Sequence, residues 1–285
     1  MKQSEDHKKQ VVRYYDATKR DYRILWRSDR SLGIHFGYYD GQHQTHDEAI
    51  LNINAKLSDL AGVTAQDRIL DAGCGIGGST LWLAANRGCQ AVGVNIVPWQ
   101  VEQANMLARQ RRLEKLVSFH VADYAETKLK QGSFTLVWGL ESIVHAEDKQ
   151  AVIKEAFRLL KPGGRLIISE YILAKAAFNP REQAALDRWL KGWAMPSLMT
   201  EEQYRTMARK AGFTQVAVED WTEQVRPSLM RLNRLIKLLR PIAPLLHRLR
   251  VVNKVQLGNL AASEAQMKLL AKGLWRYKVI VAKKP

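Results

Sequence analysis

Short apolar runs recur through the middle of the chain, and segments with apolar residues at helical spacing lie between several of them. The runs predict β-strands over 68–71, 90–94, 117–120, 134–138 and 165–170. The periodic segments predict helices over 79–88, 98–111 and 149–160. Alternating strands and helices favour an α/β fold of the doubly wound, Rossmann-like kind, with a mostly parallel sheet covered on both faces.

The N-terminal part departs from this alternation and predicts a helical cap over residues 1–62. An aromatic-rich helix is expected within the first thirty residues, and Thr45 is placed to cap a second helix that Gly62 ends. A turn-rich stretch separates the two helices. Its residues His35, Tyr38 and Tyr39 are candidates for lining a ligand site.

The alternation also breaks after residue 170. Lys161, Pro162, Gly163 and Gly164 predict a tight turn before the fifth strand. The remaining pattern predicts helices over 181–198 and 200–211 and strands over 213–220 and 275–282. We therefore expect a core domain formed by 63–225 and 274–285, with 226–273 inserted before the last strand as a helical lid.

Positive charge is concentrated in that insertion. The chain carries 44 Lys+Arg against 28 Asp+Glu, a net charge of +16, which favours anionic partners. No acidic residue lies between Glu223 and Glu264. The cations of this basic segment are Arg226, Arg231, Arg234, Lys237, Arg240, Arg248, Arg250 and Lys254.

The basic segment predicts an amphipathic helix, with leucines on one face, Arg231, Arg234 and Lys237 away from it, and Pro241 at its end. Such a helix can cover an acceptor site, lie on an anionic membrane surface, contact nucleic acid, or simply pack on the core. A lid or plain packing ranks first, membrane contact second and nucleic acid third, because no recognisable nucleic-acid-binding module accompanies the helix.

The cysteine count and the apolar runs restrict the setting of the protein. Cys74 and Cys89 form neither a disulfide framework nor a metal-ligand cluster, so we expect no metal site. The N-terminus has no signal-peptide pattern, and no run approaches the roughly 18 apolar residues of a membrane span. These features favour a cytoplasmic protein, with peripheral membrane contact as the alternative. The oligomeric state stays open.

The strongest chemical signal is the sequence Asp71-Ala72-Gly73-Cys74-Gly75-Ile76-Gly77. It follows a predicted strand and precedes a predicted helix, where glycines let a ligand pack on bare backbone. A carboxylate before the first glycine would repel a pyrophosphate but suits an ammonium group. This order predicts a nucleotide-like ligand that carries an amino group.

With this glycine-rich turn, the later Lys161–Gly164 turn and the strand order, the chain resembles the class I S-adenosylmethionine-dependent methyltransferases. Within that class, the stretch from Trp138 to His145 and the sequence Ser169-Glu170-Tyr171 resemble sterol, tocopherol and natural-product methyltransferases. The resemblance implies S-adenosylmethionine as cofactor. It covers roughly residues 68–172 well and the two ends only loosely.

The resemblance also implies which residues bind the donor. Asp71, Gly73 and Gly75 would hold the methionine moiety, with Cys74 in the same turn. Asn95 and Ile96 would flank the ribose and adenine, although an acid is more usual at position 95. The remaining donor candidates are Gln100, Asp123 and Tyr124 near the nucleoside, and Tyr14 and Tyr22 near the donor carboxylate.

Three residues at the ends of predicted strands are candidates for catalysis. His145 is the expected general base because its ordinary pKa is near neutral. Glu141 and Glu170 are expected to orient His145, or to stabilise a carbocation if the acceptor is an alkene. In the families that the chain resembles, this Glu and His lie between donor and acceptor.

These observations predict methyl transfer to a small lipophilic or anionic acceptor. Carbon of an isoprenoid, including a prenyl diphosphate, is the first expectation for the methylated group. Oxygen or nitrogen of an aromatic natural product or a quinone is the alternative. A nucleic-acid methyltransferase and a non-catalytic donor-binding protein are further alternatives.

Overall fold

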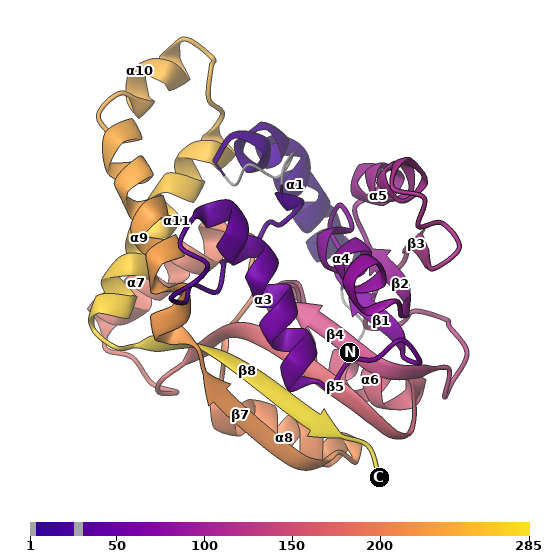
Figure 1. The fold of residues 1–285 in the computed structure, drawn as a ribbon. Coiled ribbons are helices and arrows are strands. Elements are labelled where there is room, and N and C mark those ends of the chain that lie inside the picture. The colour runs from indigo at the N-terminus through magenta and orange to yellow at the C-terminus, as the bar shows by residue number, and fades with distance from the viewer. Residues whose placement is uncertain (1–3, 26–30) are drawn as a thin grey trace.

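The computed structural model describes residues 4–25 and 31–285, with the backbone alone for 21–25. Within these residues, eight strands form one sheet in the order β3-β2-β1-β4-β5-β8-β7, with β6 beside β5 (Figure 1). β8 runs antiparallel to both of its neighbours, and the other pairs are parallel. The strands are β1 (Arg68–Ala72), β2 (Gln90–Asn95), β3 (Val117–Val121), β4 (Phe134–Leu140), β5 (Leu160–Leu173), β6 (Met199–Thr200), β7 (Thr214–Asp220) and β8 (Trp275–Lys283). The expected Rossmann-like, mostly parallel fold is confirmed.

Helices cover both faces of the sheet, as the continuous apolar runs of the strands require. One face packs against α3 (His46–Leu60), α4 (Gly78–Arg87) and α5 (Pro98–Gln110), and the other against α6 (Lys149–Leu159) and α8 (Glu201–Ala211). Thr45 caps α3 in a reciprocal capping box with Glu48, as the sequence predicts.

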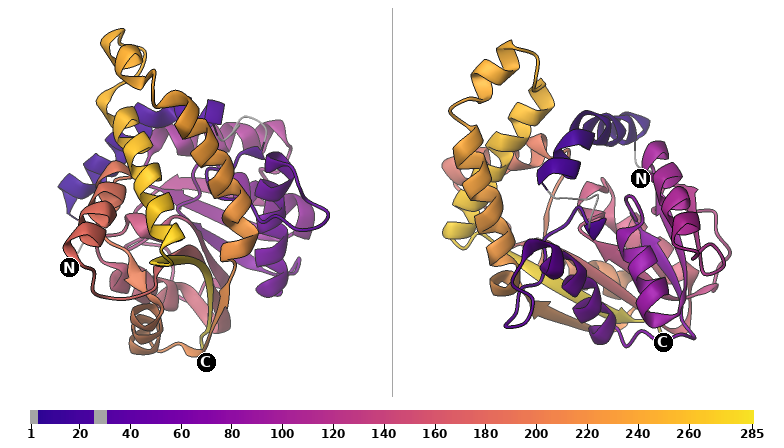
Figure 2. Two further views of the ribbon diagram at one scale, coloured as in Figure 1. Left: turned by 90° about the vertical axis from the view of Figure 1, so that its left-hand side faces the viewer. Right: turned by 45° about the horizontal axis from the view of Figure 1, so that its top comes forward.

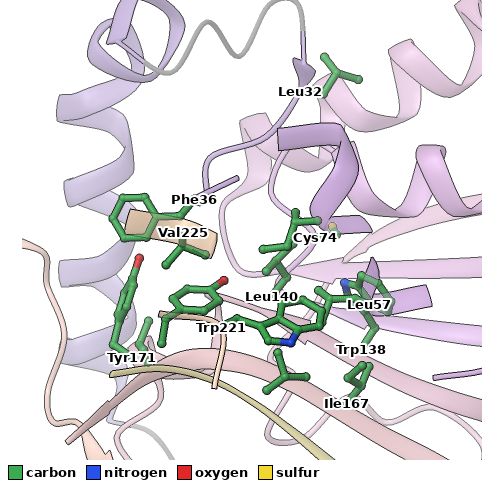
Figure 3. Close-up of a cluster of buried hydrophobic side chains, with 14 of the residues drawn as sticks. Leu32, Phe36, Leu57, Cys74, Trp138, Leu140, Ile167, Tyr171, Trp221 and Val225 are labelled. Carbon is green, nitrogen blue, oxygen red and sulfur yellow. The ribbon is translucent and has the colours of Figure 1, made fainter. Parts of the chain in front are cut away.

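A buried cluster on the first face holds the segment after residue 31 against the sheet. Figure 3 shows Trp138 and Leu140 of β4 and Ile167 and Tyr171 of β5 in this cluster, with Phe36 beside them. The rings of Phe36 and Tyr171 are 5.8 Å apart at 64°, an edge-to-face contact. This packing fixes Phe36, whose backbone takes part in the site described below.

Four of the remaining helices form a separate layer beyond the β5–β8 side of the sheet (Figure 2). They are α7 (Pro180–Gly192), α9 (Thr222–Leu239), α10 (Ala243–Arg248) and α11 (Lys254–Ala271). The helix α1 (Glu5–Leu25) runs from α11 toward α5, where Lys19 lies over the Trp99 ring. The chain passes from α9 through α10 to α11 before it enters β8, and α9 ends before Pro241 as predicted. No helix in the described part of the chain is long and apolar enough to span a membrane.

One sequence prediction about element bounds is wrong, and one predicted turn falls inside a strand. The helix expected over 181–198 ends at Gly192, because Ala194 takes a left-handed φ of 50° and the chain turns back there. The turn expected at Lys161–Gly164 is present as a bulge within β5: Phe134 pairs with Leu160 and Leu136 with Arg165, and Gly163 has a left-handed φ of 74°. Gly163 and Gly164 exchange hydrogen bonds with Lys284, so these residues remain part of the sheet.

Candidate active site

The glycine-rich turn between β1 and α4 opens one cavity of the molecule. Gly73, Gly75 and Gly77 all have left-handed φ values, of 91°, 55° and 90°, which side chains disfavour. A Cβ on Gly73 would lie 2.4 Å from the Cβ of Ser142, whereas a Cβ on Gly75 would meet no atom within 4 Å. The turn therefore needs glycine at position 73 for packing, and at position 75 it leaves bare backbone beside open space.

This first cavity, the donor cavity, has an empty volume of about 730 Å³, counting the part open to solvent. Asp71 lies on its wall, buried, and accepts a hydrogen bond from the Thr80 hydroxyl at 2.6 Å. Burial raises the pKa of Asp71 to about 6. The predicted residues that line the cavity are Asp71, Gly73, Cys74, Gly75, Asn95, Ile96, Gln100, Tyr124, Glu141 and His145.

Two buried amide side chains on the donor cavity test whether S-adenosylmethionine fits. Asn95 Nδ2 donates to Gln100 Oε1 at 2.6 Å, and Asn95 Oδ1 accepts from the Val97 amide at 3.3 Å. The Gln100 Nε2 amide is buried and makes no hydrogen bond to the described residues. A buried donor without a partner is costly, so a ligand oxygen such as a ribose hydroxyl suits this position. The cavity therefore fits the nucleoside of the donor.

A second, larger cavity, the acceptor cavity, lies under the helical layer. Its empty volume is about 1020 Å³ on the same measure, and its walls are mostly apolar. No Lys or Arg lies among its described lining residues. Gln256, Asn259 and Ser263 of α11, at helical spacing, give it one polar stripe. The apolar lining from the lid is Leu232, Ile236, Leu239, Ala243, Leu246, Val252 and Leu260.

Four residues line both cavities and so form the wall between them: Tyr15, Ile34, Glu141 and His145. Three of the four carry groups that can exchange protons. The sequence brings them together from α1, the loop before α3 and the loop after β4. A chemical group that is transferred from one cavity to the other must therefore pass these four residues.

The hydrogen bonds of His145 define its tautomer. Its Nδ1 lies 3.2 Å from the Ala194 carbonyl oxygen, which can only accept, so the proton is on Nδ1. Its Nε2 is then the basic atom, and the Tyr15 hydroxyl donates to it at 3.1 Å. Burial lowers the pKa of His145 to about 4, so the ring is neutral at physiological pH. His145 can accept a proton at Nε2.

Glu141 is held by donors from three separate segments. Its Oε1 accepts from the Phe36 amide and the Tyr277 hydroxyl, both at 2.8 Å, and the Tyr171 hydroxyl donates to Oε2. Burial nevertheless raises the pKa of Glu141 to about 7. Its backbone has a left-handed φ of 49°, which the surrounding contacts enforce. The carboxyl group is thus fixed at the shared wall among aromatic rings.

Glu170 does not line either cavity. Its Oε1 accepts from the amides of Ile143 and Val144 at 2.7 and 3.3 Å, and burial raises its pKa. The buried Lys149 ammonium binds the carbonyl groups of the same loop: it donates to Val144 and Ala146 at 3.4 and 2.9 Å. Glu170 and Lys149 therefore hold the loop that carries His145 from two sides.

The other predicted donor residues divide between the two cavities and the surface. Tyr124 lines the donor cavity and donates to the Ser142 carbonyl at 2.9 Å. Tyr14 lines the acceptor cavity instead, with its hydroxyl donating to Asn259 Oδ1 at 2.9 Å. Asp123 lies outside both cavities, where it caps the Ala125 amide and pairs with Lys8 at 3.2 Å. The Tyr22 side chain lies outside the described residues.

The candidates in the loop before α3 are also separated. His35 lines the donor cavity, whereas Tyr38 packs on Trp221, with ring centroids 4.9 Å apart, and lines neither cavity. Tyr39 lies at neither cavity wall.

The sequence interpretation missed Tyr15 and Lys149. Tyr15 follows Val11 by one helical turn, and both line the donor cavity, so the i, i+4 spacing carried a usable signal. Lys149 had no such signal, because it lies on a predicted helix where a lysine is usually solvated. The structure describes no cluster of three or more potential metal ligands in residues 4–25 and 31–285.

Comparison with known proteins agrees with this geometry. A family model described as a methyltransferase domain matches residues 70–168. The chloroplastic tocopherol O-methyltransferase of Arabidopsis thaliana is 30% identical over 77% of this chain and 67% of its own length. The 27-O-demethylrifamycin SV methyltransferase of Amycolatopsis mediterranei is 31% identical over 77% of this chain and 79% of its own.

Among solved structures, a geranyl diphosphate methyltransferase in complex with GPP and sinefungin has a TM-score of 0.77 at 21% identity. The match covers 98% of this chain and 100% of that one, and it bears on the fold alone. The chain belongs to the class I S-adenosylmethionine-dependent methyltransferases of small molecules. S-adenosylmethionine is its methyl donor.

Proposed function

We propose that the acceptor is an uncharged lipophilic molecule and that its methylated atom is an alkene carbon of an isoprenoid. The observation that carries this proposal is the acceptor cavity, which is large, apolar and without Lys or Arg among its described lining residues. A diphosphate buried there would lack cationic partners, at a large desolvation cost. The cavity therefore favours an uncharged acceptor over a prenyl diphosphate.

The polar stripe on α11 supports a defined orientation of such an acceptor. Asn259 is tied to the Tyr14 hydroxyl at the cavity wall, and Ser263 lies one turn further along the helix. A single hydroxyl or carbonyl group of the acceptor would hydrogen-bond to this stripe while its chain contacts the leucines of α9 and α10. A few polar groups in an apolar cavity are the usual basis for orienting a ligand.

The shared wall supports the chemistry. When bound, S-adenosylmethionine supplies a methyl group on a positively charged sulfur. As the alkene carbon would bond to that methyl, the methyl–sulfur bond would break and neutral S-adenosylhomocysteine would leave, so that positive charge would pass from sulfur to the neighbouring acceptor carbon. The rings of Tyr171 and Trp193 line the same cavity and would stabilise positive charge, and Glu141 in its ionised form would add a negative charge. Loss of a proton to Nε2 of His145 then restores a double bond.

Methylation of a hydroxyl oxygen is the second candidate. The neutral His145 ring, with Nε2 at the shared wall and 3.1 Å from the Tyr15 hydroxyl, suits removal of a hydroxyl proton as the oxygen–carbon bond forms. The 30% identical Arabidopsis protein carries the name of an O-methyltransferase. Nucleic acid is disfavoured as acceptor because an apolar, lid-covered cavity gives no partner to a phosphate backbone.

Transfer of a deuterated methyl group tests the proposal. The purified protein would receive trideuteromethyl-labelled donor with one of three acceptors: a polyprenyl alcohol, a prenylated hydroquinone, or geranyl diphosphate. Tandem mass spectrometry locates the label. Label on an alkene carbon of the polyprenyl alcohol supports the first candidate, and label on a hydroquinone oxygen supports the second. Preferential labelling of geranyl diphosphate would overturn the proposal of an uncharged acceptor.

A further inference from the structure

The connection at the far end of the helical layer exposes an unusual amount of apolar surface. We define the lid tip as residues 237–251, from the end of α9 through α10. Five of the nine exposed large hydrophobic residues in the described part of the chain lie within it. They are Leu238 (73% exposed), Leu249 (62%), Leu245 (57%), Val251 (55%) and Ile242 (47%). Contiguous apolar exposure of this kind is uncommon on a protein surface that stays in water.

The lid tip has two different apolar faces. Ala243 and Leu246 point inward and line the acceptor cavity. Ile242, Leu245 and Leu249, spaced by three and four residues within and at the two ends of α10, form a second row of apolar side chains, the outer face, which lines neither cavity and is exposed. The inner face is explained by its place on the wall of the acceptor cavity. The outer face is not buried by any described part of the chain. It needs a separate explanation.

The charge around the outer face selects the kind of partner. Lys237, Arg248 and Arg250 are exposed beside the apolar residues, and Arg240 is exposed while paired with Glu264 at 2.6 Å. The whole span between Glu223 and Glu264 has no acidic residue. Apolar side chains surrounded by cations match an anionic lipid surface, where the leucines enter the acyl boundary and the cations meet the headgroups.

The shape of the molecule allows this contact. α10 projects beyond the other helices and away from the sheet in both views (Figures 1 and 2). We infer that the lid tip docks on an anionic lipid bilayer, with Ile242, Leu245 and Leu249 inserted and Lys237, Arg248 and Arg250 at the headgroups. This docking goes beyond the proposed function and does not depend on the identity of the acceptor. If the acceptor is lipophilic, the same helices contact both the membrane and the acceptor cavity.

Vesicle flotation tests the docking with the full-length protein and no acceptor. Vesicles would contain phosphatidylcholine alone or phosphatidylcholine with phosphatidylserine. We expect the wild type to float with the anionic vesicles only. The variant L245S/L249S should bind them at least about tenfold more weakly, given the apolar area each leucine removes from water. The variant K237Q/R248Q/R250Q should lose on the order of a hundredfold, at about fivefold per cation.

Matched controls separate docking from general effects of charge and folding. The variant L51S/M106S removes two other exposed hydrophobic residues, and R111Q/K115Q/K161Q removes three other exposed cations. Both controls should float like the wild type. All variants should keep S-adenosylhomocysteine binding, because none of these residues lines the donor cavity.

Three results would overturn the inference. The first is flotation of L245S/L249S equal to that of the wild type, and the second is no flotation of the wild type at all. The third is a wild-type dimer, measured by light scattering, that L245S/L249S converts to monomer without any vesicle present. That result would assign the outer face of the lid tip to a second copy of the chain.

Discussion

The donor cavity and the acceptor cavity meet at one wall but are built in different ways. The donor cavity is formed largely by the loops at the carboxyl ends of parallel strands, where the glycine-rich turn exposes backbone. The acceptor cavity is formed largely by side chains of α1, α9, α10 and α11, which come from opposite ends of the sequence. One cavity thus depends on a local backbone conformation, and the other on how distant helices pack.

This difference explains how one fold can bind the same methyl donor in different proteins while its specificity for the acceptor changes. A backbone-lined cavity tolerates few substitutions, because its glycines have φ values that side chains disfavour. A cavity lined by helical side chains changes shape and polarity with each substitution on the lid. Tyr15, Ile34, Glu141 and His145 belong to both cavities, so we expect them to affect transfer rather than the binding of either ligand alone.

The largest effect is expected for H145A. Loss of the proton acceptor at the shared wall should lower turnover by about two to four orders of magnitude, the range for a general base. S-adenosylhomocysteine affinity, measured by calorimetry, should stay within a few-fold of wild type. H120A removes an exposed histidine of β3 and should match the wild type in both assays. Equal losses of turnover and donor affinity in H145A would break the division between the cavities.

A smaller effect is expected from the lid. Leu239 is half-buried and lines the acceptor cavity, whereas its neighbour Leu238 is 73% exposed and does not. L239S should raise the KM for the acceptor about tenfold in vesicle-free solution, since it removes apolar contact worth roughly 1.5 kcal/mol. L238S should leave the KM unchanged. If the two variants behave alike, α9 does not present its inner face to the acceptor.

The smallest effect concerns stability and pH. Burial raises the pKa of Glu141 from 4.5 to about 7, so between these values the folded protein holds a proton that the unfolded chain releases. The stability contributed by this group is fully present below pH 4.5 and is lost as pH rises through 7. Relative to E141Q, the wild type should therefore lose on the order of 1–3 kcal/mol across this window. Urea unfolding at several pH values measures the difference.

A control with the opposite sign is available for that experiment. Hydrogen bonds from Ser4 lower the pKa of the exposed Glu147. The stability that Glu147 contributes is therefore lost as pH falls, not as it rises. A wild-type minus E141Q difference that is flat between pH 4.5 and 7, or that rises, would show that Glu141 is not buried in its protonated form.

The two cavities also differ in how much of each could be predicted from the sequence. The strands, the glycine-rich turn and most residues that line the donor cavity could be predicted, because they depend on local patterns within residues 68–124. Asp123 shows the limit of that approach: the motif position was identified, but Lys8 from α1 holds its carboxyl outside the donor cavity. The acceptor cavity could be predicted only as a lid over 226–273. Its pairing of Tyr14 with Asn259 joins residues 245 positions apart.

The wall residues show why catalytic roles were only partly predictable. Glu141 and His145 were identified from their spacing after a strand, and both lie at the wall. Glu170 ends the neighbouring strand, but its side chain bonds to the amides of Ile143 and Val144 rather than facing a cavity. The direction of a side chain at a strand end depends on tertiary contacts that a strand pattern does not contain.

The most direct test of the account is calorimetric titration of S-adenosylhomocysteine into the variants G75V and G62V. Both glycines have left-handed φ values, of 55° and 60°, with nothing within 4 Å of an added Cβ, so valine strains the backbone similarly in each. Only Gly75 lies on the donor cavity. We predict that G62V binds the ligand like the wild type and that G75V does not bind it. Equal affinities in the two variants would contradict the assignment of the glycine-rich turn as the donor site.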